Sequence, residues 1–156
     1  MIHTVPGSAN MLSAYLVDTN VLLRWSLKSD PQHEVIRRAL DTLQVTKVIL
    51  YVAPQTVAEY WNVLTRPANK NGFGFTPEEV EAETLLLEAS FVVLEDSLTA
   101  YREWRRLVRD AKVSGVQVHD ARLAALMISH GLTHLLTFNA RDFARYGVTP
   151  IDPATI

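Results

Sequence analysis

The sequence contains no cysteine. This absence excludes disulfide bonds, thiolate metal sites and cysteine nucleophiles, and it agrees with a location in the cytoplasm. Long apolar runs are also missing, since none approaches the roughly 20 residues that a membrane-spanning helix requires. We therefore expect no membrane partner.

A dominant charge is missing as well. The 15 Lys and Arg residues are matched by 17 Asp and Glu residues, which leaves a formal net charge of -2. A surface that is basic throughout is thereby excluded, so a nucleic-acid partner requires a local basic patch. The chain has 156 residues, of which 48% are apolar and 21% charged, and these values suit one folded domain with a single core.

The first residues, MIHTVPGSANMLS, have neither the basic nor the apolar segment of a signal peptide. We expect a loose N-terminal tail over residues 1–13 and a single domain over residues 14–156. Met11, just ahead of the first predicted strand, is a second candidate for the natural start beside Met1.

From residue 14 onward, β-rich runs alternate with helical patterns. The patterns predict strands at 14–18, 48–53, 91–95, 133–137 and 148–151, and helices at 20–26, 31–45, 54–66, 97–112 and 118–130. Thr76, with Glu79 three residues later, has the spacing of a capping box and predicts one more helix start. Strands separated by helices favour parallel crossovers, so the expected fold is a three-layer α/β/α domain with a mainly parallel sheet.

Four acidic positions lie inside or at the edge of apolar runs. They are Asp18 in LVDTNVLL, Glu59 in QTVAEYWNVLT, Asp120 in VHDARLAALMISHG and Asp142, with Asn139 close by, in LLTFNARDF. A charge in such a setting is costly to bury unless it is paired, hydrogen-bonded or bound to a cation. Parallel sheets bind ligands beyond the carboxyl ends of their strands, and the four positions fall near such ends or near helix starts. They therefore predict one acidic pocket.

The residue types indicate the chemistry of this pocket. Mg²⁺ and Mn²⁺ prefer hard oxygen ligands, which carboxylates supply. A cation held in this way neutralises phosphate, orients a water molecule and lowers the pKa of that water. The sequence thus favours a metal-dependent enzyme that acts on phosphodiester bonds.

Each acidic position also has a simpler interpretation when it is taken alone. Asp18, Thr19 or Asn20 suits a helix N-cap, and Asp142 suits a turn or a cap. Asp120 suits the N-terminal end of a helix dipole, and Glu59 suits a solvated helix face. The sequence disfavours two other classes of phosphoryl-transfer protein. A phosphatase requires Asp-x-Asp after the first strand and a receiver domain requires paired acids there, whereas this chain has Asp-Thr-Asn.

Taken in order, the motifs LVDTNVLL, QTVAEYWNVLT, HDARLAALMISHG and LLTFNARDF resemble the PIN domain family and, within it, the VapC-type toxins of bacterial toxin-antitoxin modules. The resemblance runs from about Tyr15 to Ile151. It implies a three-layer α/β/α fold and a ribonuclease that depends on Mg²⁺ or Mn²⁺. It also implies three partners: an RNA substrate, a cognate antitoxin protein and a second copy of the chain in a homodimer.

The family pattern implies a role for each matched residue. Asp18 and Asp120 match the most direct metal ligands, and Glu59 matches the acid that completes the site. Thr137 matches the small hydroxyl residue that hydrogen-bonds within the acidic cluster, and Asn20 is expected to support the same cluster.

One position departs from the family pattern, because Asn139 stands where many members have Asp. The lost charge favours one firmly held metal, with Asn139 or Asp142 positioning the attacking water or a second cation. The departure also leaves an alternative open, in which the chain is a non-catalytic PIN-like module that binds RNA or protein.

RNA must be held beside an acidic site, so basic residues near the motifs are candidate phosphate contacts. We expect this role for Arg122 and Arg141, and after them for Arg66. The predicted helix 97–112 carries four arginines, which form either a phosphate-binding stripe or the solvated face of an amphipathic helix.

Overall fold

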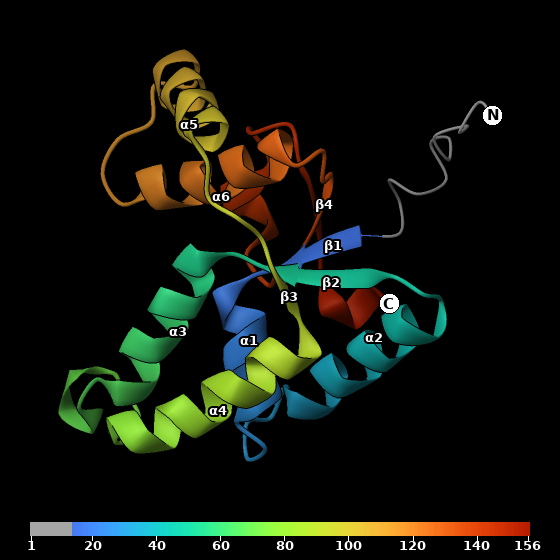
Figure 1. The fold of residues 1–156 in the computed structure, drawn as a ribbon, viewed down its shortest axis with the longest axis vertical. Coiled ribbons are helices and arrows are strands. Elements are labelled where there is room, and N and C mark those ends of the chain that lie inside the picture. Colours follow the sequence, from blue (N-terminus) through green and yellow to red (C-terminus); the bar gives the residue numbers. More distant parts are fainter. Residues whose placement is uncertain (1–13) are drawn as a thin grey trace.

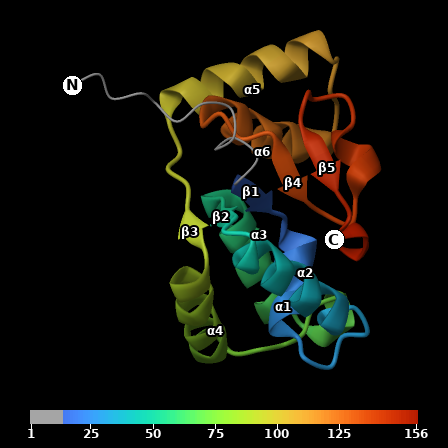
Figure 2. The same ribbon diagram turned by 90° about the vertical axis from the view of Figure 1, so that its right-hand side faces the viewer.

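The computed structural model describes residues 14–156, and the predictions for the first 13 residues lie outside this range. Five strands form the central sheet: β1 (Ala14–Val17), β2 (Ile49–Val52), β3 (Val92–Val93), β4 (His134–Leu136) and β5 (Thr149–Ile151). They lie in the order β3-β2-β1-β4-β5, and every pair of neighbours is parallel; Figure 1 labels the first four strands and Figure 2 labels all five. The predicted parallel sheet is confirmed.

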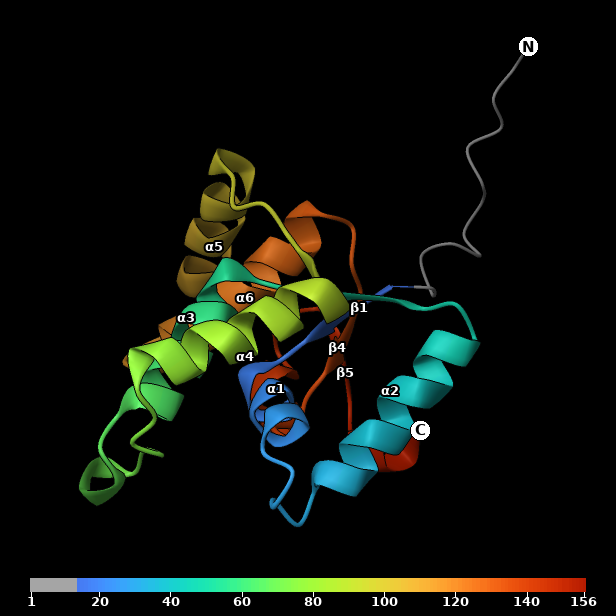
Figure 3. The same ribbon diagram turned by 60° about the horizontal axis from the view of Figure 1, so that its bottom comes forward.

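Helices cover both faces of the sheet. On one face lie α5 (Leu98–Asp110) and α6 (Gln117–Ser129), and on the other lie α1 (Thr19–Ser26), α2 (His33–Val45), α3 (Pro54–Thr65) and α4 (Pro77–Ser90). Figure 2 shows the layers from the side, and Figure 3 brings the layer of α1–α4 forward. Three 3-10 turns complete the described chain: η2 (Ala68–Lys70), η3 (Ala140–Phe143) and η4 (Pro153–Thr155). Within residues 14–156, no helix has the length and apolar character needed to cross a bilayer.

Neighbouring strand residues face opposite helix layers. Leu16 packs with α5 and α6, whereas Val17 packs with α1–α4, and both are fully buried. Leu135 and Leu136 of β4 divide in the same way. Because the sheet is covered on both faces, its central strands are continuous apolar runs, as the sequence shows.

The strand order brings the carboxyl ends of β1 and β4 together. From β1 the chain moves outward through β2 to β3, and it then returns to β4 on the other side of β1. The backbone amide of Asp18, just after β1, donates to the carbonyl of Leu136 in β4 over 3.0 Å. Open α/β sheets bind ligands at the carboxyl ends of their strands where the strand order reverses in this way.

Local signals fix where the helices begin. Asp18 caps α1, and Pro54 and Pro77 occupy the first turns of α3 and α4, where a missing N–H costs nothing. The predicted capping box at Thr76 is present, since its hydroxyl accepts from the amide of Glu79 over 3.1 Å. These starts decide which side chains reach the edge of the sheet.

Candidate functional site

Asp18 lies where β1 meets α1, and its side chain is buried. Its Oδ1 accepts a hydrogen bond from the backbone amide of Thr19 over 2.7 Å. Its Oδ2 accepts from the hydroxyl of Thr137 over 2.8 Å and from the side-chain amide of Asn20 over 3.2 Å. The helix-cap interpretation of Asp18 is therefore confirmed, and the same contacts hold its carboxylate in one orientation at the sheet edge.

Thr137 and Asn20 tie the ends of β1 and β4 around this carboxylate. Thr137 is fully buried, and its hydroxyl oxygen accepts from the amide of Asn139 over 3.0 Å. Asn20 accepts from the amide of Phe138 over 3.2 Å through its Oδ1. Both residues that the sequence indicated as supporting are thus in contact with Asp18.

Glu59 lies in the second turn of α3 and is linked to two other helices. The hydroxyl of Thr19 donates to its Oε2 over 2.7 Å. The amide of Gln55 donates to its Oε1 over 3.1 Å and to the carbonyl of His119 over 2.9 Å. Because His119 precedes Asp120, these bonds bring the N-terminal turns of α1, α3 and α6 to one rim, as the sequence predicted.

The electrostatic environment of Asp18 is unfavourable to its charge. Its pKa is raised from 3.8 to about 6, chiefly because the group is buried and further because Glu59 and Asp120 are negatively charged. The hydrogen bonds from Thr137 and Thr19 oppose this rise. In the folded chain, the negative charge of Asp18 is therefore not compensated by its surroundings.

Asp120, in the first turn of α6, is subject to similar effects. Its pKa is raised by partial burial and then by the charges of Asp142 and Glu59. His119 and Arg145 act in the opposite direction. The four predicted acids are therefore close enough to influence one another, although they come from four separate motifs.

These residues differ in exposure. Asp18 is buried, Glu59 and Asp120 are partly exposed, and Asn139 and Asp142 are exposed. The sequence predicted that the charge of each acid would be costly to bury. This prediction is wrong for Asp142, because its side chain is exposed. In the part of the chain that the structure describes, no three Asp, Glu or His side chains already stand at metal-binding distances from a common point.

The chemistry of the donor set nevertheless fits a divalent cation. Among residues 14–156, no Lys or Arg forms an ion pair with any of the four acids. A buried carboxylate with negative neighbours is stabilised by a bound cation. All available donors are oxygen atoms, which Mg²⁺ and Mn²⁺ prefer.

The three predicted phosphate contacts occupy different places. Arg141 is exposed in η3, directly before Asp142 in the chain. Arg122 is exposed on α6 and pairs with Asp96 over 3.7 Å. Arg66 follows the last residue of α3, at the end remote from Glu59, where it donates to a backbone carbonyl of the next loop over 2.8 Å. No contact of Arg66 supports the phosphate role that was expected of it.

The four arginines of α5 are partly used in surface ion pairs. Arg106 pairs with Glu103 over 2.7 Å, and Arg109 pairs with Asp110 over 2.9 Å. These pairs agree with the solvated-face interpretation of the helix.

Three polar residues of the site were not predicted as part of it: Thr19 and Gln55, which hold Glu59, and Arg145, whose charge acts on Asp120. A signal existed for Gln55, because residues four positions apart on a helix meet. No sequence signal marked Arg145, since η3 and the following turn bring it to α6 only in the folded chain, where it contacts Gln117.

Comparisons with known proteins identify the fold. A family model described as PIN domain matches residues 15–148. VapBC2 from Rickettsia felis, solved with a DNA fragment from its promoter, is similar with a TM-score of 0.68 and 15% identity over 88% of this chain and 97% of that chain. DNA-bound VapBC from Salmonella typhimurium has a TM-score of 0.66 and 21% identity over 90% and 98% of the two chains.

A third similar structure is VapC20 from Mycobacterium tuberculosis, described as a toxin that cleaves the sarcin-ricin loop, with a TM-score of 0.60 and 20% identity over 83% and 93% of the two chains. No curated protein sequence matched the chain. At these identities, the solved structures show a common fold. Because the family model covers most of the chain, the protein belongs to the PIN domain family, and it has the fold of VapC-type members.

Proposed function

We propose that the protein is a metal-dependent endoribonuclease, the toxin of a type II toxin-antitoxin system. One observation carries the proposal: the buried carboxylate of Asp18 lies where the strand order reverses, with Glu59 and Asp120 beside it and a raised pKa. Such a group is suited to binding a cation. Family membership supports a nuclease, since the resemblance of the four motifs implies RNA cleavage.

In this proposal Asp18, Asp120 and Glu59 hold Mg²⁺ or Mn²⁺. The bound ion supplies neutralisation of the phosphate and a water of lowered pKa for hydrolysis. The protein positions the ligands: Thr137 orients Asp18, and the hydroxyl of Thr19 orients Glu59. Glu59 and Asp120 are only partly buried, so packing leaves their side chains room to turn toward Asp18.

Asn139 and Asp142 lie at the exposed edge of the site, where an RNA strand would approach. We assign them the positioning of the attacking water or of a second cation. Hydrolysis in this arrangement requires no covalent intermediate, because water is the nucleophile.

The second candidate function is a PIN-like module that binds RNA or protein without cutting. Two observations favour it: the uncharged Asn139, and the separation of the acids from a common metal-binding point within residues 14–156. Cleavage assays distinguish the two functions.

The test uses purified protein and RNA with Mg²⁺ or Mn²⁺. We expect cleavage that EDTA abolishes and that Asp18→Asn or Asp120→Asn reduces at least a hundredfold. Asp41→Asn, which removes a carboxylate from the exposed face of α2, serves as a control and should cleave normally. Equal cleavage by the parent and Asp18→Asn would refute the metal assignment, and no cleavage by the parent with either metal would favour the binding module.

The proposal includes an antitoxin partner and a homodimer. The Rickettsia and Salmonella neighbours were solved as VapBC assemblies with DNA. Apolar side chains that such contacts could cover are exposed on α4 and β3, namely Leu85, Leu86, Val92 and Val93. Light scattering of the purified chain tests the dimer. The location in the cytoplasm stays a prediction from the missing cysteine.

A further inference from the structure

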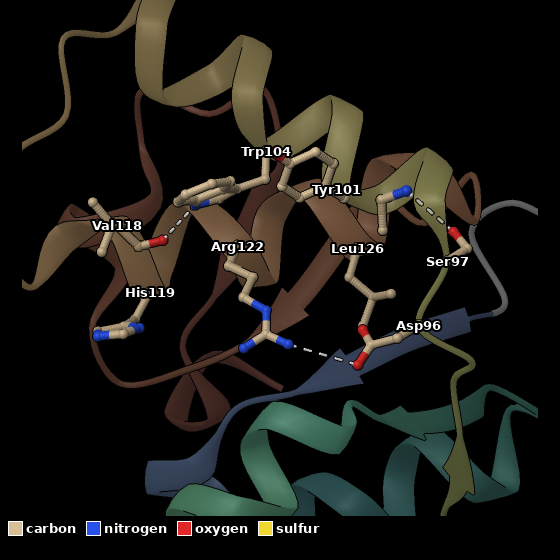
Figure 4. Close-up of a pocket in the computed structure, with 9 residues that line it drawn as sticks. Asp96, Ser97, Tyr101, Trp104, Val118, His119, Arg122 and Leu126 are labelled. Atoms are coloured by element: carbon tan, nitrogen blue, oxygen red, sulfur yellow. Dashed lines mark hydrogen bonds and ion pairs between the residues drawn. The ribbon is translucent and has the colours of Figure 1, made fainter.

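A cavity of about 420 Å³ lies between α5, α6 and the segment that follows β3 (Figure 4). This volume falls within the range of small-ligand sites, about 300 to 1,000 Å³. Aromatic and aliphatic side chains form most of its lining, and Asp96 and Arg122 supply charged groups at one side. The proposed metal site uses none of these side chains.

Two aromatic rings line the cavity, and one of them is held by a hydrogen bond. The indole N–H of Trp104 donates to the carbonyl of Val118 over 2.9 Å, which fixes the ring. Tyr101 lies beside it with a centroid separation of 6.1 Å, and 54% of Tyr101 is exposed. Accessible aromatic rings are the usual platforms on which unpaired RNA bases stack.

The charged side of the cavity matches one base in particular. Asp96 and Arg122 lie 3.7 Å apart, and both are about half exposed, so their mutual attraction is weak enough for a ligand to replace. Guanine presents adjacent N–H donors on its Watson–Crick edge and the acceptors O6 and N7 on the neighbouring edge. A carboxylate and a guanidinium side by side are therefore complementary to guanine.

The cavity and the acidic site meet at the first turn of α6, where His119 precedes Asp120. His119 lines the cavity, and the carbonyl of His119 accepts from Gln55, which also donates to Glu59. Arg122 stands two residues after Asp120 on α6, so the two side chains leave the helix in different directions from neighbouring backbone positions. An RNA strand with a phosphate at the acids therefore has a neighbouring nucleotide within reach of the cavity.

We propose that this cavity binds an unpaired guanine of the RNA substrate next to the cleavage site, stacked on Tyr101 and Trp104 and read by Asp96 and Arg122. The inference rests on the proposed ribonuclease function and adds a sequence preference to it. It assigns the specificity for RNA sequence to α5, α6 and the segment after β3, which are separate from the metal ligands.

The test measures binding in EDTA, so that it does not depend on cleavage. The probes are fluorescent oligouridines with one central G, A, C or U, and fluorescence anisotropy gives the affinities. We expect the parent to bind the G-containing probe about tenfold more tightly than the others, in line with one good base contact. Asp96→Asn and Arg122→Gln should remove this preference, and Tyr101→Ala should weaken binding of every probe.

Arg105→Gln is the matched control for Arg122→Gln, because Arg105 is exposed on α5 and lies outside the cavity lining. It should lower all affinities alike and leave the preference for G unchanged. Circular dichroism checks that each variant is folded. A parent without preference for G, or a preference that survives both Asp96→Asn and Arg122→Gln, overturns the proposal.

Two further outcomes distinguish a failure of the guanine site from a failure of the proposed ribonuclease function. A preference for G in EDTA without metal-dependent cleavage would refute the ribonuclease and leave the guanine site standing. Cleavage at sites unrelated to G, unchanged by Asp96→Asn, would refute the guanine site alone. If Tyr101→Ala weakened binding of a co-expressed protein partner but of no RNA probe, the cavity would be a protein-docking site and the proposal would fail.

Discussion

The carboxyl group of Asp18 lowers the stability of the protein at neutral pH. Its pKa is about 6 in the folded chain and 3.8 as a free group. The folded state therefore holds the proton more tightly than the unfolded state does. The stability that Asp18 contributes is fully present below pH 3.8, and it is lost as the pH rises through about 6.

From this sign we predict that Asp18→Asn stabilises the metal-free protein at pH 8 by about 1 to 3 kcal/mol, the range that a shift of this size implies. The gain should shrink as the pH falls toward 4, because the parent carboxyl group is then neutral too. Urea unfolding in EDTA at both pH values measures it, with Asp41→Asn as the control. A variant less stable than the parent at pH 8 would contradict the burial argument.

Thr137 allows a second test at the residue scale. Thr137→Val keeps the shape but removes the hydroxyl that bonds Asp18 and the amide of Asn139, so we expect a loss of about 1 to 3 kcal/mol in unfolding free energy. Cleavage should fall about 10- to 100-fold, as is usual for residues that orient metal ligands. Thr137→Ser keeps the hydroxyl and should retain most activity. Equal losses in both variants would show that the methyl group matters instead.

The sequence predicted the acids but not all of their surroundings. Asp18, Glu59 and Asp120 each stand in a motif, and their positions relative to strand ends follow from the alternation of elements. The hydrogen bond from Thr19 to Glu59 depends on the angle between α1 and α3, which no local sequence pattern encodes. The expectation for Arg66 has no support in the structure, because Arg66 follows the last turn of α3 whereas Glu59 lies in the second turn.

At the scale of elements, helix and strand boundaries agree with the predictions to within a few residues. The largest difference relative to length is in β3, which is predicted at 91–95 and observed at Val92–Val93. As the edge strand it pairs with β2 alone, and directly after it the amide of Leu94 still donates to the carbonyl of Val52 over 2.8 Å. The sequence shows the β-rich run but not its place in the sheet.

The capping box of α4 gives a prediction at this scale. Thr76→Ala removes the hydroxyl that accepts from the amide of Glu79, and we expect a loss of about 1 kcal/mol in unfolding free energy. RNA cleavage should be unchanged, because α4 contributes nothing to the acidic site. Ser90→Ala, at the other end of the same helix, is the control and should have a smaller effect. A loss of cleavage in Thr76→Ala would show that α4 influences the site.

At the scale of the whole molecule, the alternation of strands and helices predicted a parallel three-layer fold, but not the order β3-β2-β1-β4-β5. Strand order is decided by which apolar strands pair after collapse, and several orders satisfy the same hydrophobic pattern. The resemblance to the PIN domain family predicts the strand order as well, because it implies a complete fold.

Metal binding should stabilise the whole molecule. A ligand that binds only the folded state adds about 2.7 kcal/mol when its concentration is 100 times Kd. For a chain of this size, that free energy raises the melting temperature by roughly 5 to 10 °C. We expect Mg²⁺ or Mn²⁺ to produce such a rise in the parent and little rise in Asp18→Asn, as measured by calorimetry. Identical rises in both proteins would place the metal elsewhere.

The hydrogen bond between Asp18 and Thr137 joins residues that are 119 positions apart. Ribosomes add about 5 to 20 residues per second, so several seconds separate the synthesis of the two halves of the site. Until β4 emerges and pairs with β1, the nascent chain has acids but no enclosed centre to hold them. For the proposed ribonuclease, the topology thus delays assembly of the centre until late in synthesis, when β4 has been made.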